Sequence, residues 1–120
     1  MPAVKWSQAV EDDDFEAGRR HLELLYPPTN AAALVRKLKS APIQKFAAKD
    51  VLRASELELL PAKDPEVTKQ SKKIAKRVAL SPLLIVREAG HARLIIADGF
   101  HRLCAVMHID PASDVACKIS

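Results

Sequence analysis

A chain of 120 residues, with 48% hydrophobic and 28% charged side chains, has the composition of a single globular domain. It contains no stretch approaching the roughly 20 apolar residues of a membrane span and no apolar run of signal-peptide length, so we expect a cytoplasmic protein. The charge is uneven. Residues 1–16 hold one lysine against five acids, and the rest holds 18 basic against 10 acidic side chains, which favours anionic ligands.

The first predicted element follows a stretch without hydrophobic periodicity. Residues 1–13 show no such pattern, which predicts a loose N-terminal arm. Residues 14–26 place apolar side chains at helical spacing, and the Asp cluster at the start suits the positive end of a helix dipole. Pro27 and Pro28 should end this helix.

A second helix is predicted over residues 30–39, with Thr29 or Asn30 as its cap. We expect the two helices to form a helical hairpin over residues 14–40. The remaining residues, 41–120, should then form the core of the same domain.

Three elements are predicted in the middle of the chain. Residues 42–47 are typical of a short strand, and residues 51–55 of a short helix. Alternation of leucine and glutamate over residues 56–60 predicts a further strand that ends before Pro61.

A long helix is predicted over residues 64–78, because Asp64 can cap it and Pro65 suits the first helical position. The positions that we expect to face inward are Val67, Ser71, Ile74 and Val78. A different face carries Lys69, Lys72 and Lys76. That face is either a solvated stripe or part of an anion site.

The C-terminal third has the clearest pattern. Two aliphatic runs, residues 83–87 and 92–97, flank the loop 88–91 and predict a β-hairpin. A helix over residues 100–108 and a half-buried strand over 115–119 follow. We therefore expect an α/β fold (α+β) in which helices flank a small mixed sheet.

The most informative motif is the turn Asp98-Gly99-Phe100-His101-Arg102, which joins the second hairpin strand to the helix. Free N–H groups and the positive dipole end at such a helix start attract anions. Asp98 should cap the helix, and Gly99 should let a ligand approach the backbone. His101 and Arg102 are two potential cations in an unfavourable position for the dipole, which a bound anion would explain. Alternatively, both are exposed or paired with a carboxylate.

This turn and its surroundings resemble the ParB/sulfiredoxin superfamily. The resemblance covers residues 57–119, with its strongest part in the run from Leu94 to Ala105. In ParB-like ADP-dependent serine kinases the turn reads Asp-Gly-His-His-Arg, which matches four of the five positions here. The helical hairpin lies outside the resemblance.

The resemblance implies a nucleotide site that holds ATP, ADP or CTP with magnesium. The phosphate-binding residues would be Asp98, Gly99, Phe100, His101 and Arg102, with Lys69 and Lys72 from the helix over residues 64–78. Phe100 stands where sulfiredoxins have their reactive cysteine, so sulfinic-acid reduction is not expected. The DNA-reading helices of ParB proteins have no counterpart in this sequence.

Several other candidates have weaker support. The kinases need a glutamate base, for which Glu56, Glu58 and Glu66 are candidates by location. Cys104 and Cys117 lack metal or redox spacing and are expected to be reduced core thiols. We expect no metal site.

The sequence thus predicts a protein that binds a nucleotide or another phosphorylated small molecule, with phosphotransfer as an extension of that function. The alternative is a non-catalytic binding module associated with nucleic acid, which it would bind weakly, or with a protein partner. A homo-oligomer is compatible with either function, and no membrane partner is expected.

Overall fold

The structure, a computed structural model, describes residues 3–87 and 92–120. In chain order the elements are α1 (Asp12–Leu22), α2 (Pro28–Ser40), β1 (Ile43–Ala47), α3 (Ala48–Ser55), α4 (Pro65–Ala75), β2 (Leu83–Val86), β3 (Ile95–Asp98), α5 (Phe100–Ile109) and β4 (Asp114–Ile119). The expected α/β fold with a mixed sheet is confirmed. None of the helices in the described ranges is long and apolar enough to cross a membrane.

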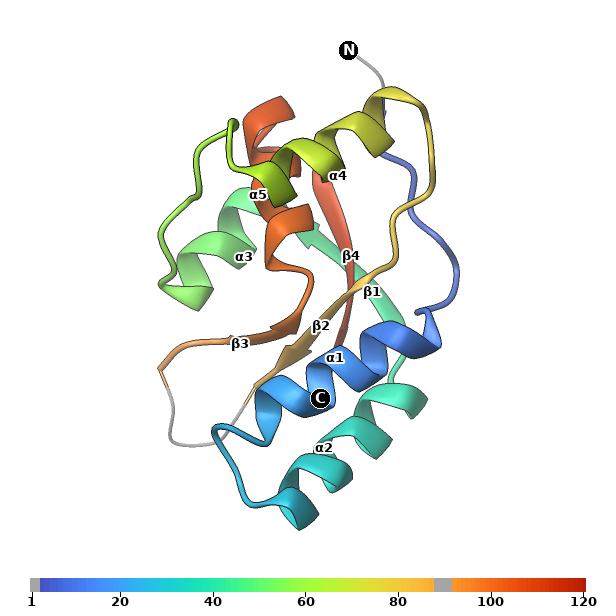
Figure 1. Ribbon diagram of the computed structural model, residues 1–120, viewed down its shortest axis with the longest axis vertical. Helices are drawn as coiled ribbons and strands as arrows, with labels where there is room; N and C mark the ends of the chain where they lie inside the picture. The colour runs from blue at the N-terminus through green and yellow to red at the C-terminus, as the bar shows by residue number, and fades with distance from the viewer. Residues whose placement is uncertain (1–2, 88–91) are drawn as a thin grey trace.

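The sheet has the strand order β1-β4-β2-β3 (Figure 1). The predicted hairpin strands β2 and β3 pair antiparallel, as do β1 and β4, whereas β2 and β4 run parallel. The predicted loop 88–91 lies outside the described residues. All four residues of the inner strand β2 are fully buried, because helices cover the sheet on both of its faces.

Successive side chains of β2 enter two separate cores. Leu84 and Val86 pack with residues of α1 and α2 in one cluster. Leu83 and Ile85 join residues of α3, α4 and α5 in the other. The predicted helical hairpin therefore forms, and it supplies one outer layer of a three-layer arrangement (Figure 1).

The predicted loose arm over residues 1–13 is wrong for much of its length. Trp6 forms a parallel bridge with Leu80, and the Ser7 N–H donates to the Leu80 carbonyl at 2.8 Å. The indole Nε1 of Trp6 donates to the carbonyl of Asp114 at 3.2 Å. An arm without periodicity is held here by backbone bonds, which hydrophobic spacing cannot reveal.

The predicted strand before Pro61 is also wrong, since residues 56–60 form neither helix nor strand. Leu57 and Leu59 are exposed, at 44% and 40%. Alternating apolar residues form a strand only where they pair with a neighbouring strand, and residues 56–60 are not among the strands of the sheet.

The start of α2 is set by its prolines and not by the predicted polar caps. α2 begins at Pro28, one residue before Thr29, and neither Thr29 nor Asn30 provides a side-chain cap. α1 ends at Leu22, and turns lead from there to Pro27.

The predicted start of α4 at Asp64 and Pro65 is confirmed. The Asp64 carboxylate accepts hydrogen bonds from the N–H groups of Glu66 and Val67, both at 3.1 Å. The helix ends at Ala75 rather than residue 78, because Arg77 takes a left-handed conformation with φ of 60°. Val78 is consequently 46% exposed, and its predicted inward position is wrong.

Candidate functional site

The predicted phosphate-binding turn forms at the junction of β3 and α5. Gly99 occupies the N-cap position with a left-handed φ of 106°, and its carbonyl accepts the N–H of Leu103 at 3.0 Å. No side chain caps α5, so the predicted capping role of Asp98 is wrong. Asp98 is instead the last residue of β3, and its carboxylate turns toward Arg102.

Arg102 is bound by two carboxylates of its own chain. Its Nη2 lies 2.8 Å from Oδ2 of Asp98 and 3.3 Å from Oδ2 of Asp14 in the first turn of α1. The side chains of all three residues, here called the Arg102 cluster, are 13–18% exposed. The alternative in which Arg102 pairs with a carboxylate is therefore the one observed.

The space above Gly99 is filled by the same arginine. A Cβ at this position would lie 2.8 Å from Nη2 of Arg102 and 2.8 Å from Cγ of Leu83. The sequence predicted that glycine leaves room here for a ligand. In the structure that room holds the guanidinium group, which folds back over the turn.

Burial also changes the titration of the cluster. Desolvation raises the pKa of Asp98 above its ordinary value of 3.8, and the nearby Asp14 carboxylate adds to the increase. The positive charge of Arg102 opposes both effects. An Asp14 oxygen and Nε of Arg102 are buried without a hydrogen-bond partner in the described part of the chain, so the cluster is incompletely satisfied.

The other two residues of the turn have different environments. Phe100 is half-buried against the core formed with α3 and α4. His101 is exposed, and its ring centroid lies 6.2 Å from that of Phe100. Of the predicted cations in the turn, His101 is thus accessible and Arg102 is enclosed.

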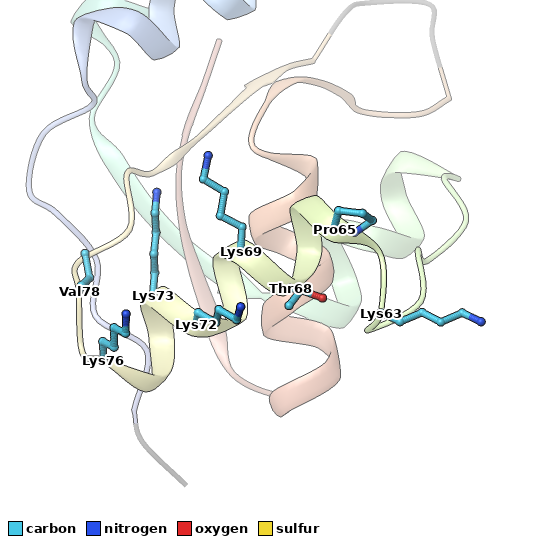
Figure 2. A pocket seen from close by; sticks show the side chains of 8 residues that line it. All are labelled: Lys63, Pro65, Thr68, Lys69, Lys72, Lys73, Lys76 and Val78. Carbon is cyan, nitrogen blue, oxygen red and sulfur yellow. The ribbon is translucent and has the colours of Figure 1, made fainter.

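A second cationic site lies on α4, as Figure 2 shows. An open concavity of about 690 Å³ follows this helix, and we call it the lysine concavity. Its lining residues are Lys63, Pro65, Thr68, Lys69, Lys72, Lys73, Lys76 and Val78. No acidic or aromatic side chain is among the described residues that line it, so the charged groups in this lining are all positive.

Four of these lysines form a row, because positions 69, 72, 73 and 76 share one side of a helix. The ammonium group of Lys63, which precedes the helix, points away from the row in Figure 2. The sequence identified Lys69, Lys72 and Lys76 as one face but missed Lys73, which was not recognised as part of it. Its spacing of four residues from Lys69 was the available signal.

The structure therefore separates the predicted site residues into two groups. α4 packs directly on α5, yet none of the residues from Asp98 to Arg102 lines the lysine concavity. Lys69 and Lys72 lie with other lysines, whereas Arg102 lies with Asp98 and Asp14.

The remaining candidates are placed as follows. Cys104 and Cys117 are buried free thiols, as predicted, and burial raises the pKa of Cys117 to about 11. Glu56, Glu58 and Glu66 are exposed, and none of them lines the lysine concavity.

Comparison with known proteins gives no match: no family model, no curated protein and no solved structure is significantly similar to this chain.

Proposed function

We propose that this protein binds a phosphate-bearing ligand, and that the lysine concavity of α4 is where the phosphates sit. The observation that carries the proposal is the row Lys69, Lys72, Lys73 and Lys76 along one concavity without a carboxylate among its described lining residues. Lysine ammonium groups bind phosphate as strongly hydrated point charges. Such a row stabilises a ligand that carries several negative charges close together.

The turn at the start of α5 has a smaller part in this proposal. A phosphate that approaches the guanidinium group of Arg102 competes with Asp98 and Asp14, which already bind its Nη2. The exposed His101 and the first N–H groups of α5 have no such competitor at the side-chain level. Within the described residues, the lysine concavity brings several lysines together without a carboxylate in its lining.

The ligand class that we propose is a nucleoside di- or triphosphate, with ATP, ADP and CTP as candidates and magnesium as the counterion. Thr68 is a polar, uncharged side chain in the lining, and its hydroxyl donates to the Ala62 carbonyl at 2.9 Å. With that hydroxyl engaged, nothing in the described lining is arranged to read a base. We therefore expect similar affinities for ATP, CTP and inorganic tripolyphosphate, and a lower affinity for ADP, which carries one phosphate fewer.

Calorimetric titration of ATP, ADP, CTP and tripolyphosphate, each with and without magnesium, tests the proposal. The double variant Lys69→Ala/Lys72→Ala should bind each of them about tenfold more weakly, a loss of roughly 1.4 kcal/mol. The matched control is Lys37→Ala/Lys49→Ala, which removes two exposed lysines from α2 and α3. Equal affinity of the parent and the concavity variant would refute the proposal.

A second candidate function, association with nucleic acid, is favoured by the length of the lysine row. Lys69 and Lys76 lie seven positions apart, with Lys76 directly after the end of α4, which places about 10 Å of cationic surface along one line. Such a row can follow the phosphates of a nucleic acid strand without reading its bases. Binding of this kind should lose affinity steeply between about 50 and 200 mM salt and show no sequence preference. Fluorescence anisotropy with two unrelated duplexes distinguishes this from mononucleotide binding.

A further inference from the structure

The two edges of the sheet differ in how well they are protected. The order β1-β4-β2-β3 places β1 at one edge and β3 at the other. β1 carries an exposed lysine, Lys45, and exposed charges discourage pairing with another strand. β3 has no charged residue before Asp98, its last position. By this criterion, β3 is the edge that is open to pairing.

Few bonds cross the outer edge of β3 within the described residues. The Leu94 N–H donates to the Ala54 carbonyl at 2.9 Å, just before the strand starts, and no other backbone bond is made there. Alternate N–H and C=O groups of an edge strand point outward, so residues 95–98 present unpaired backbone groups.

Exposed leucines flank this edge on both faces of the sheet. A groove of about 190 Å³ runs along Ile95 and Ile96, with Leu25 after α1 on one side and Leu57 after α3 on the other. Leu25 is 54% exposed and Leu57 44%, and the adjacent Leu24 is 87% exposed. An apolar strand partner would cover these side chains, which water surrounds in the single chain.

The charges of α1 indicate which partner fits. The helix begins with Asp12, Asp13 and Asp14 and ends with Arg19, Arg20 and His21. It lies along β3 in the opposite direction, because Asp14 meets the Asp98–Arg102 end, whereas His21 lines the groove at Ile95. In a second copy related by a two-fold axis, α1 runs in the opposite direction. The acidic first turn of α1 in one copy then lies beside the basic last turn of α1 in the other copy.

We propose that two copies of this chain pair through their β3 strands, antiparallel and about a two-fold axis, to form one continuous sheet. This arrangement satisfies the outer backbone groups of both strands and covers the exposed leucines of each copy with the other copy. It also sets the acidic first turn of each α1 against the basic last turn of the other. The interface is separate from the lysine concavity and does not depend on the proposed ligand.

Sedimentation velocity with light-scattering mass measurement tests the interface. The full chain should reach twice its 13.2 kDa mass at protein concentrations of about 100 μM or below, the range of a modest interface. Leu24→Asp and Leu57→Asp should each return it to a monomer. Phe46→Asp is the matched control, since Phe46 is 42% exposed on the other edge strand, and it should leave the dimer intact.

Exchanging charges on α1 tests whether the two copies pair antiparallel. Arg20→Glu should weaken the dimer at least severalfold, because it places a glutamate beside the acidic first turn of α1 in the other copy. The double variant Asp13→Lys/Arg20→Glu should restore the dimer. A parent that stays monomeric at about 100 μM, or a dimer that Leu24→Asp and Leu57→Asp leave unchanged while Phe46→Asp abolishes it, would overturn the proposal. Unchanged melting temperatures of the variants show that folding is not the cause.

Discussion

The turn before α5 and the exposed face of α4 differ in how their basic side chains are surrounded. Two carboxylates enclose Arg102 of the turn, whereas no carboxylate is among the described residues that line the lysine concavity of α4. Arg102 lies in the first turn of a helix, where the dipole disfavours a cation. Lys72 and Lys73 lie in the last turn of α4, where the dipole favours cations. The dipole argument correctly required an anion beside Arg102, and the fold supplies carboxylates from β3 (Asp98) and from α1 (Asp14). A motif at a helix start therefore indicates a need for negative charge, without saying whether ligand or protein provides it.

The largest effect expected from this comparison is on folding stability. Arg102→Ala should lower the free energy of unfolding by about 3 kcal/mol, because it leaves the largely buried carboxylates of Asp14 and Asp98 without their cation. Urea unfolding measures the change.

An exposed pair provides the control for that experiment. Arg53 lies 3.6 Å from Asp50 on α3, with side chains 86% and 57% exposed. Arg53→Ala should therefore lower the free energy of unfolding by less than about 1 kcal/mol. Equal losses from Arg102→Ala and Arg53→Ala would mean that the Arg102 cluster is no more than a surface ion pair.

Gly99→Ala should lower the free energy of unfolding by about 2 kcal/mol, which is less than the effect of Arg102→Ala. The new Cβ meets the guanidinium group of Arg102 and the side chain of Leu83, and φ of 106° is unfavourable for alanine. Gly18→Ala in α1 is the comparison, since its Cβ meets Leu84 Cδ1 at 3.3 Å while the helix gains propensity. Thermal unfolding of both variants measures the difference. If Gly99→Ala is as stable as the parent, Arg102 does not fill the turn.

The smallest effect should appear in the pH dependence of stability. Asp98 holds its proton more tightly in the folded chain than in the unfolded chain, because burial raises its pKa above 3.8. Its contribution to the free energy of unfolding therefore falls as pH rises from 3.8 through the folded pKa. Asp98→Asn should remove this decline. Unfolding curves at successive pH values above 3.8 give the free energy of unfolding as a function of pH for both proteins. The same slope against pH for the variant and the parent would contradict the prediction.

The sequence predicted those parts of the fold that depend on local chemistry. Asp64 and Pro65 mark the start of α4 correctly because a cap and a first-turn proline act within one turn of helix. The aliphatic run of β2 was recognisable because both of its faces are buried.

The errors concern contacts between distant segments. Nothing near Arg102 in the sequence indicates that Asp14 lies beside it, 88 positions earlier, since the first turn of α1 reaches it only when the sheet has formed. The leucines before Pro61 alternate like a strand, but strand pairing depends on a neighbour that the local pattern does not contain. Helical spacing alone places Lys69, Lys72 and Lys76 on one face, and the resemblance made Lys69 and Lys72 candidates for phosphate binding.

The most direct test of where phosphate binds is a titration of inorganic tripolyphosphate into uniformly ¹⁵N-labelled protein, followed by backbone amide chemical shifts. We expect the largest shifts at Lys69, Lys72, Lys73 and Lys76, with Gly99 and Arg102 nearly unchanged because the carboxylates keep the guanidinium group. Large shifts at Gly99 and Arg102 without movement on α4 would contradict the account and return the phosphate site to the turn.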